Sequence, residues 1–460
     1  MFKVQLLMVL CAISVTAIAQ PQLAGGATTT VQQDHNAFSQ PASNLDFSGR
    51  LEFSTGNSFF RNPWVAAPAT TIARDGLGPL FNTNSCQSCH IKDGRGRAAA
   101  VGSSNAVSML VRVSVPATNA EQEQQQLKLG PLPEPNYGGQ IQDQSLSGHH
   151  SEARVRIEYG TKSVDLNGSA PAKLRVPKLV VDQLGYQDMH PETLFSVRVA
   201  PPMIGLGLLE SIAEEDILKN TDPLDNNKDG ISGQANWVWD AKTQQHSLGR
   251  FGWKAGQPNL NQQNAAAFSG DLGLTTSMFG SDDCRTSQTN CISAVNGGTP
   301  EVSDKILAMV EFYTQHLAVP MRRDVDSQSV MQGEKLFTQA NCVACHQPSF
   351  VTQKREDRPA LSEQVIYPYT DLLLHDMGDD LSDNRPEFAA SGNQWRTPPL
   401  WGIGLTQSVN GHSELLHDGR ARNVEEAILW HGGEAAPSQQ FFRELEPKQR
   451  QQLVDFVNSL

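Results

Sequence analysis

The feature that most limits what this chain can fold into is a five-residue pattern that occurs twice. Cys-x-x-Cys-His stands in the segments CQSCH (86–90) and CVACH (342–346). A thioredoxin-like dithiol has no use for the histidine, and a zinc ion shared by both motifs would leave two histidines without a role. The pattern is the attachment signature of c-type haem, where two thioethers hold the porphyrin and the histidine binds the iron. It predicts two covalently bound haem c groups, held by Cys86, Cys89, His90, Cys342, Cys345 and His346.

The N-terminal residues indicate export. One lysine precedes an apolar run that ends in Ala17-Ile18-Ala19, and this is the pattern of a secretory signal peptide cleaved after Ala19. The run is shorter than the ~20 residues that a membrane span needs. We therefore expect a signal peptide over 1–19, a periplasmic location and no membrane span.

Composition limits the partners and the disulfides. The formal net charge of −13 without a basic cluster argues against a nucleic-acid partner. Cys284 and Cys291 lie in a polar loop with no adjacent histidine, which predicts a structural disulfide. The Gln- and Ser-rich segment 20–45 has little apolar content, so we expect a flexible linker there.

A weak internal repeat predicts the architecture. RVAPPMIGLGLLES (198–211) echoes RTPPLWGIGLTQS (396–408), and each copy follows one Cys-x-x-Cys-His motif. Apolar residues recur at helical spacing in 303–318, 326–341 and 446–460, whereas 153–181 alternates around Asn167-Gly168 like a β-hairpin. We expect a mainly α protein of two cytochrome-c-like haem domains, 46–320 and 321–460, with long loops and a hairpin inserted in the first.

A second metal is suggested by the segment TDPLDNNKDGISG. Asp225, Asn227 and Asp229 alternate before Gly230, like the start of an EF-hand loop that binds calcium through oxygen atoms. The twelfth loop position is Asn236, where a glutamate would be expected. A calcium site at these three residues and a plain Asx-rich turn both remain open.

Several motifs together resemble a known family. They are CQSCHIKDGRG, RVAPPMIGLGLLE, PYTDLLLHDMG, WRTPPLWGIGL and HDGRARNVEEAILWHGG. The set is similar to the di-haem oxidoreductases often labelled thiol oxidoreductases, which are related to bacterial di-haem cytochrome c peroxidases and to MauG. The resemblance covers nearly all of the mature chain, roughly from Ser48 onward, and it implies a haem-dependent, peroxidase-like oxidoreductase. Dithiol chemistry finds little support, because haem would consume the four motif cysteines.

The resemblance also implies roles for single residues. In the relatives, the sixth ligand of the C-terminal haem follows the His-Asp-Gly-Arg motif, and the corresponding position here is His431. A surface histidine near a helix end is the rival interpretation. Ligation by two imidazoles favours ferric iron, so this haem would serve as an electron reservoir. The relatives also hold a calcium ion between their haems and pass electrons near a tryptophan; the candidates here are Trp253, Trp395, Trp401 and Trp430.

The N-terminal haem is then the candidate reactive centre, because no second ligand is evident near it. Cleavage of peroxide needs a group that moves a proton and polar support for the developing charge. In the relatives a glutamate between the two haem motifs does this, which makes Glu134, Gln140 and Glu210 the candidate catalytic residues. The candidate partners of the haem propionates are His375, His417, Arg396 and Arg420.

Three functions follow from these observations. The first is a peroxidase that reduces hydrogen peroxide with electrons from a small donor cytochrome or cupredoxin. The second is a MauG-like oxidase that acts on a protein or organic substrate, and the third is a di-haem electron carrier without catalysis. An open N-terminal haem favours the first two, and the peroxidase is our prediction.

Overall fold

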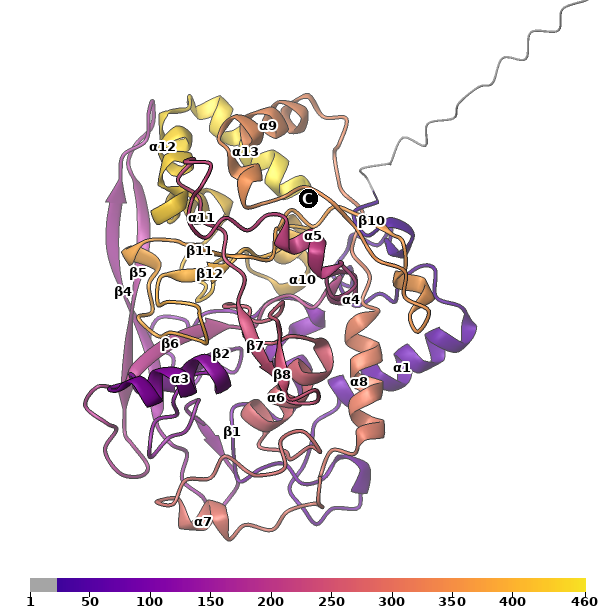
Figure 1. Ribbon diagram of the computed structural model, residues 1–460, viewed down its shortest axis with the longest axis vertical. Helices are drawn as coiled ribbons and strands as arrows, with labels where there is room; N and C mark the ends of the chain where they lie inside the picture. The colour runs from indigo at the N-terminus through magenta and orange to yellow at the C-terminus, as the bar shows by residue number, and fades with distance from the viewer. Residues whose placement is uncertain (1–22) are drawn as a thin grey trace, which may run out of the picture.

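The computed structural model describes residues 23–460 (Figure 1). The predicted signal peptide, 1–19, lies outside the described residues. Within 23–460 no helix combines the length and the apolar character needed to cross a bilayer.

The helices are spread along the whole described chain. They are α1 (Phe47–Arg61), α2 (Cys86–Cys89), α3 (Ala120–Leu129), α4 (Leu206–Glu210), α5 (Glu214–Leu218), α6 (Leu260–Leu272), α7 (Thr289–Ile292), α8 (Asp304–Gln315), α9 (Gln328–Gln339), α10 (Thr406–Asn410), α11 (Val424–Leu429), α12 (Ala436–Glu444) and α13 (Pro447–Ser459). Three of them, α8, α9 and α13, lie in the segments with apolar residues at helical spacing. Those three helix predictions are confirmed.

The strands form pairs rather than one large sheet. They are β1 (Leu80–Phe81), β2 (Met109–Ser114), β3 (Gln144–Ser145), β4 (Arg154–Val164), β5 (Ala172–Asp182), β6 (Leu194–Val199), β7 (Trp237–Asp240), β8 (Gln245–Leu248), β9 (Phe350–Val351), β10 (Val365–Ile366), β11 (Leu374–Asp376) and β12 (Gln394–Arg396). Each of the two-stranded antiparallel sheets in 23–460 joins two of these strands.

The prediction of a mainly α protein with two cytochrome-c-like domains is wrong. Helix accounts for 31% of the structure and strand for 17%, distributed over several small sheets, and no cytochrome-c domain is evident. The physical reason is visible in the pairing of β2 with β6, where Met109 lies opposite Val199. Such short strands find their partners far away along the chain, so a local hydrophobic period does not reveal them.

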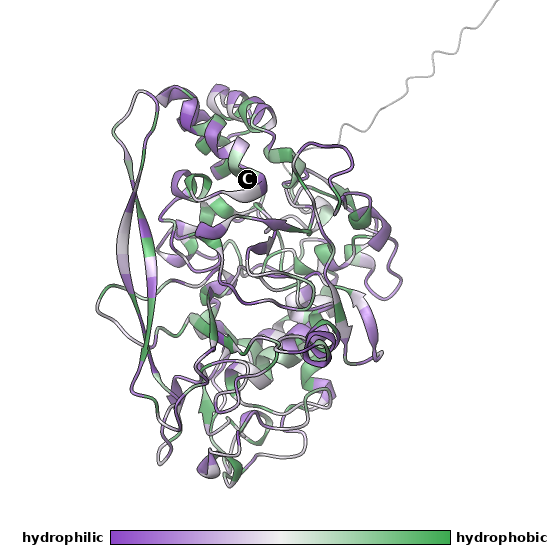
Figure 2. Ribbon diagram, turned by 60° about the vertical axis from the view of Figure 1, so that its left-hand side comes forward, coloured by the Kyte–Doolittle hydropathy of each residue, from purple (hydrophilic) through white to green (hydrophobic). Residues whose placement is uncertain are grey.

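The predicted β-hairpin is present as β4 and β5. Arg154 pairs with Asp182 at its base and Val164 with Ala172 near its tip. It runs along one side of the molecule, with hydrophilic and hydrophobic residues interspersed along both strands (Figure 2). Val155 packs in a core cluster with Val111, whereas Leu174 packs in a different cluster with helix α12. The hairpin therefore connects two hydrophobic cores.

The segment before α1 differs from the flexible linker expected over 20–45. In its described part, 23–45, Phe38 is buried, and isolated β-bridges join Thr30 to Pro320 and Pro41 to Leu317. Backbone hydrogen bonds to residues 316–319 hold the segment down. Composition missed this because backbone pairing needs few apolar side chains. The boundary predicted between residues 320 and 321 stays a prediction.

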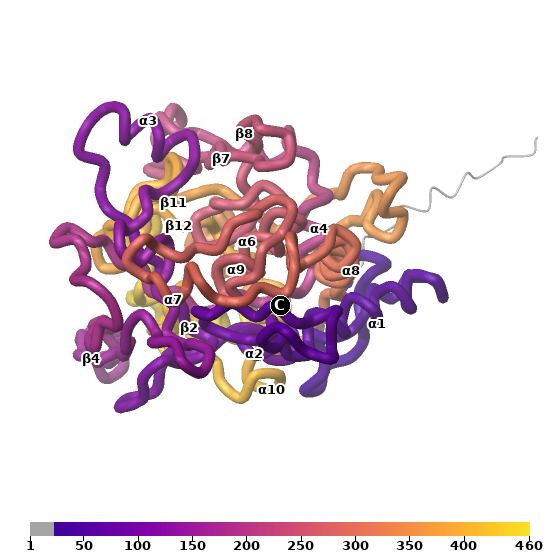
Figure 3. The backbone as a smooth tube through the Cα atoms, turned by 90° about the horizontal axis from the view of Figure 1, so that it is seen from below, coloured from indigo at the N-terminus to yellow at the C-terminus, as the bar shows by residue number. Residues whose placement is uncertain are grey.

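Two segments far apart in the sequence meet around the first motif. The loop after α2 contacts α10, because Asn410 Oδ1 accepts from the backbone N–H of Arg95 and its Nδ2 donates to the carbonyl of Ile91. Figure 3 shows α2 and α10 as neighbours although they lie far apart in the sequence. A site at the first motif is therefore built partly from the C-terminal part of the chain.

Candidate functional site

One internal cavity receives both Cys-x-x-Cys-His motifs. Its volume is about 570 Å³, and its walls come from segments throughout the chain. The predicted residues that line it are Cys86, Cys89, His90, Cys342, Cys345, His346 and His431. The structure thus brings together all seven residues predicted to hold a cofactor.

The first motif presents a neutral imidazole to the cavity. His90 Nδ1 lies 2.8 Å from the carbonyl oxygen of Pro201, so Nδ1 carries the proton and Nε2 keeps a free lone pair. Burial lowers the pKa of His90 to about 4. A neutral imidazole oriented by a backbone carbonyl is the form that binds a metal through its other nitrogen.

The second motif repeats this arrangement and adds another imidazole. His346 Nδ1 lies 2.9 Å from the carbonyl oxygen of Tyr369. Two residues after α11, His431 Nδ1 lies 2.7 Å from the carbonyl oxygen of Ala427. Burial, with a smaller contribution from the nearby His431, lowers the pKa of His346 to about 4. Both histidines face the cavity as neutral imidazoles, and both keep Nε2 free.

The four motif cysteines are unpaired thiols. Burial, followed by the charge of Asp271, raises the pKa of Cys86 to about 12 and also raises that of Cys89. Burial raises the pKa of Cys342 to about 12 as well. Reactive thiols need a low pKa and access to solvent, so these cysteines are unsuited to dithiol chemistry. Cys284 and Cys291 form the predicted disulfide.

The comparison with protein families decides the assignment. A family model described as "Di-haem oxidoreductase, putative peroxidase" matches residues 19–174 and 178–460. The chain belongs to this family. It is therefore an oxidoreductase with haem cofactors, and the resemblance read from its motifs is confirmed. No curated protein matches the chain.

The cavity of this di-haem oxidoreductase fits the charge of haem as well as its attachment. Its lining contains the side chains of Arg95, Arg112, Arg198, Arg385 and Arg396. Nε of Arg95 and Nε of Arg385 are buried without an acceptor in the described residues. A buried guanidinium N–H needs an anionic partner, and haem propionates would supply it. Of the predicted propionate partners, Arg396 lines the cavity, whereas Arg420 is paired with Asp418 outside it.

None of the three predicted catalytic residues lines the cavity. Glu134 is fully buried, and its carboxylate accepts the backbone N–H groups of Asn136, Tyr137 and His190. Glu210 accepts from the N–H of Leu260 and from Gln315 Nε2. Through these hydrogen bonds, each carboxylate stabilises the local conformation of the backbone around it.

The third predicted residue, Gln140, leads to a carboxylate that the sequence analysis missed. Gln140 Nε2 donates to Asp271 Oδ1 over 3.0 Å, and Asp271 lines the cavity at the end of α6. Burial raises the pKa of Asp271, although the charge of Arg112 opposes this. Among the carboxylates that line the cavity, Glu387 and Glu434 have ion-pair partners, whereas Asp271 has none in 23–460. The one sequence signal that could have indicated Asp271 is that it is the single acid in α6, near the end of a helix rich in amides and alanines. It lies 131 residues after Gln140 in the sequence.

His375 is a fixed cation beside the second motif. It lies in β11, with one ring nitrogen 2.8 Å from Asp371 and the other 2.7 Å from Glu434. Burial alone would lower the pKa of His375, but the hydrogen bonds to these carboxylates raise it to about 12. Its Nδ1 also lies 3.4 Å from Cys345 Sγ.

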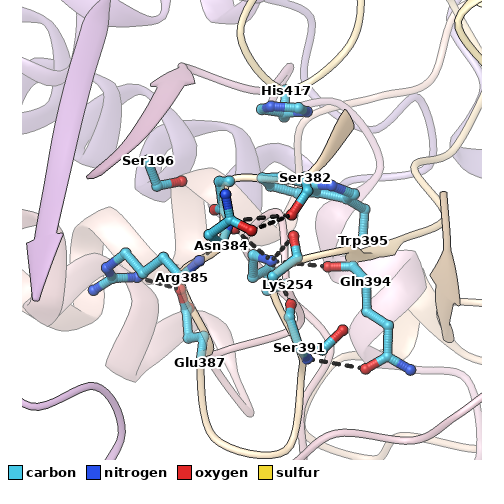
Figure 4. Close-up of polar contacts among 12 residues, drawn as sticks. Ser196, Lys254, Ser382, Asn384, Arg385, Glu387, Ser391, Gln394, Trp395 and His417 are labelled. Atoms are coloured by element: carbon cyan, nitrogen blue, oxygen red, sulfur yellow. Dashed lines mark hydrogen bonds and ion pairs between the residues drawn. The ribbon is translucent and has the colours of Figure 1, made fainter. Parts of the chain in front are cut away.

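His417 and Trp395, which both line the cavity, form a stack beside a buried lysine (Figure 4). His417 stacks on the indole of Trp395 at 3.7 Å between ring centroids. Lys254 Nζ lies 4.2 Å from the same indole, is completely buried, and pairs with Asp383 at 3.1 Å. It also donates to the carbonyl oxygens of Ser391, Gly392 and Gln394. Lys254 thus fixes the 383–394 loop under Trp395.

The predicted tryptophans differ in their neighbouring charges. A guanidinium lies over Trp253 and another over Trp430, and Lys254 lies over Trp395. A nearby cation opposes removal of an electron from an indole. Within residues 23–460, Trp401 is the one of the four with no cation over its ring, and it also lines the cavity.

The predicted calcium residues lie in an exposed loop. Asp225 Oδ1 accepts from the N–H of Gly230, Asn227 Oδ1 from that of Asp229, and Asp229 Oδ1 from that of Ile231. In the described part of the chain no group of three or more His, Cys, Asp or Glu residues is arranged to hold a metal ion. Calcium stays a prediction here.

Proposed function

We propose that this di-haem oxidoreductase is an exported c-type cytochrome that reduces hydrogen peroxide. Its haems are bound by thioethers at the two cysteine pairs, with His90 at the reactive centre and His346 with His431 at the electron-transfer centre. The observation that carries the proposal is a difference inside one cavity. His431 lines the cavity near His346, whereas among the described residues the pKa of His90 is shifted by burial and backbone hydrogen bonds and by no second histidine.

Covalent attachment is supported by the state of the cysteines. Each pair lies beside a cavity-facing histidine, and none of the four sulfurs is used in a disulfide. Their raised pKa values leave them no role as thiolates. Thioether formation would consume them, as the Cys-x-x-Cys-His pattern predicts.

The different roles proposed for the two haems follow from the number of imidazoles that would bind each iron. Two neutral imidazoles suit an iron that only exchanges electrons, and a single imidazole leaves a coordination position for peroxide. When bound, the haem iron supplies the site of peroxide binding and the electrons for its reduction. The protein supplies the fixed imidazoles, the arginines for the propionates and the group that moves protons.

Asp271 is the proposed proton-moving group at the reactive centre. Reduction of one peroxide to two waters breaks the O–O bond and consumes two electrons and two protons. Asp271 Oδ1 is held by Gln140, and its other oxygen has no partner in the described residues. A carboxyl with a pKa raised by burial exchanges protons near neutral pH more readily than an exposed one. The guanidinium of Arg112, whose charge acts on Asp271, supplies polar support.

The remaining parts of the proposal concern location, donor and calcium. The signal-like N-terminus supports a periplasmic location. A net charge of −13 favours a small basic cytochrome or cupredoxin as electron donor. The positive φ of Gly230, +81°, supports a calcium loop at Asp225, Asn227 and Asp229, because such a loop needs a sharp turn at its sixth position. Calcium would be detected by metal analysis before and after chelation.

The first experiment tests whether the two haems are covalently bound to the chain. The chain is expressed with cytochrome-maturation machinery, denatured and weighed, and the mass of two haems should remain on the polypeptide. Cys86→Ser/Cys89→Ser and Cys342→Ser/Cys345→Ser should each lose one haem. A colourless chain with the bare polypeptide mass would contradict the proposal.

The second experiment separates the three functions. Electron paramagnetic resonance of the oxidised protein should give one high-spin and one low-spin ferric haem. In stopped-flow mixing, the half-reduced protein should consume peroxide. A fast reaction of the fully oxidised protein instead would favour the MauG-like oxidase, and two low-spin haems at every redox level would favour the electron carrier.

A further inference from the structure

Behind Asp271 lies a pair of buried amides with unusual hydrogen bonding. Gln140 and Gln142 are 2% and 6% exposed. Their Nε2 atoms both donate to the carbonyl oxygen of Gly270, over 3.0 Å and 2.7 Å. Their Oε1 atoms are buried and receive no hydrogen bond from the described residues.

The orientation of these amides is fixed by their shared acceptor. A flipped amide would place its oxygen against the carbonyl oxygen of Gly270, where two acceptors would repel each other. Both Oε1 atoms therefore need donors from elsewhere. A buried polar atom without a protein partner is ordinarily satisfied by ordered water, and two such atoms on amides that share one acceptor mark a site for it.

Hydrogen bonds continue from these amides to two buried carboxyls. Gln140 Nε2 also donates to Asn82 Oδ1 over 2.6 Å, and Asn82 Nδ2 donates to Asp143 Oδ1 over 2.9 Å. On the other side, the backbone N–H of Gln142 donates to Glu152 Oε2 over 2.6 Å. Asp143 is 6% exposed and Glu152 is 1% exposed.

The cluster extends to the surface. Gln288 Nε2 donates to Glu152 Oε1 over 2.5 Å, and the backbone N–H of Arg285 donates to Gln288 Oε1. Arg285 is paired with Asp283, whose side chain is 38% exposed. A continuous set of polar groups thus leads from the 283–291 disulfide loop to the cavity.

We propose that Glu152, Asp143, Gln140 and Gln142 form a proton-delivery path that ends at Asp271. This inference rests on the proposed peroxide reduction, because each turnover must bring two protons into a buried site. Carboxyls donate and accept the protons, and water held by the two amide oxygens carries them between carboxyls. Asp271 then passes them to the oxygens of the broken O–O bond.

The protonation of the two carboxyls fits this role. Burial raises the pKa of Asp143 to about 7 against the hydrogen bond from Asn82. Burial raises the pKa of Glu152 to about 8 against the hydrogen bonds from Gln142 and Gln288; the charge of Asp283 adds to the rise and the charge of Arg285 opposes it. At the other end of the path, burial raises the pKa of Asp271 and the charge of Arg112 opposes this rise. Burial and, to a smaller extent, the charge of Glu152 raise the pKa values of Tyr137 and Tyr186. Acids of this strength release and regain protons near neutral pH.

The test compares isosteric variants with a matched control. Glu152→Gln and Asp143→Asn keep shape but cannot release a proton. Glu311→Gln is the control. Burial raises the pKa of Glu311 too, and an amide, Asn261, contacts it. Glu311 is half-buried and, within the described part of the chain, has no hydrogen bond to the residues of the path. With both haems loaded, each path variant should lower kcat at pH 7 at least tenfold, leave KM for peroxide unchanged and raise the solvent deuterium isotope effect on kcat. Glu311→Gln should match the wild type.

Two further readouts do not depend on turnover. A high-resolution crystal structure should place a water within hydrogen-bond distance of both amide oxygens. The infrared spectrum at neutral pH should contain carboxylic acid bands that Glu152→Gln and Asp143→Asn each remove. A dry site, or wild-type kcat and isotope effects in both path variants, would overturn the path while the peroxidase proposal stands. A fully loaded wild type that does not consume peroxide would overturn the peroxidase proposal, and the water and infrared readouts would then decide whether the path exists.

Discussion

The two cysteine motifs have nearly the same local structure but different surroundings. In each, the histidine directs Nδ1 to a backbone carbonyl and Nε2 to the cavity. The second motif is faced by His431 and lies beside the cation His375. The first lies beside the acid Asp271 and the polar cluster behind it. The difference teaches that two nearly identical motifs receive different surroundings from distant segments of the chain, and that these surroundings are what can give them different functions.

Removal of His431 is the change that should break this difference most completely. In His431→Ala the second motif loses its facing imidazole, so both haems would have one imidazole ligand. The low-spin ferric signal should disappear from the electron paramagnetic resonance spectrum, and peroxide turnover with an electron donor should fall at least a hundredfold. The exposed His35 offers a control, His35→Ala, which should leave both unchanged. A retained low-spin signal would show that His431 is not the ligand.

Lys254 tests whether the two parts of the cavity are held together by buried charge. In Lys254→Met the buried carboxylate of Asp383 loses its partner at 3.1 Å and keeps only Arg198 at 3.9 Å, and breaking such a buried pair costs about 3–5 kcal/mol. Chemical denaturation should give a free energy of unfolding lower by that amount. The exposed ion pair of Lys354 with Glu356 provides the comparison, because Lys354→Met should change stability by less than about 1 kcal/mol. Equal effects of the two variants would contradict a structural role for Lys254.

Variants of Asp271 and Glu134 test which of the two carboxylates acts in peroxide reduction. Asp271→Asn should lower kcat for peroxide by about a hundredfold or more, the range for loss of a general acid or base, without loss of haem. Glu134→Gln should leave kcat within twofold and lower stability by about 1–3 kcal/mol, because three backbone N–H groups lose a charged acceptor. The reverse result would return the catalytic role to Glu134.

These residues also mark what the sequence could and could not predict. Both haem motifs, the disulfide, the hairpin and the position of His431 were predictable, because each depends on a short local pattern or a fixed spacing. Asp271 was not, because its role arises only when the end of α6 reaches Gln140. The small sheets and the packed segment 23–45 depend on pairing between distant residues in the same way. Local patterns therefore predicted which cysteines and histidines meet at the cavity, whereas tertiary contacts determine the residues around them.

The two regions should also respond to pH in opposite directions. Burial lowers the pKa of His417 to about 4, so between pH 6.5 and 4 the unfolded chain binds the proton and acid destabilises the fold. Burial raises the pKa of Asp143 to about 7 and of Glu152 to about 8. Between about pH 4.5 and these values the folded state holds the protons, so stability falls as pH rises.

Each of these groups contributes at most about 1.4 kcal/mol per pH unit, so the effects must be separated by variants. Unfolding free energies measured from pH 4 to 8 should fall less on the alkaline side in Glu152→Gln than in the wild type. His417→Gln should instead flatten the acidic side. Because different residues act on His417 and on Glu152, the double variant should lose both slopes additively. A loss of both slopes in either single variant would mean that His417 and Glu152 are coupled more tightly than their separate contacts indicate.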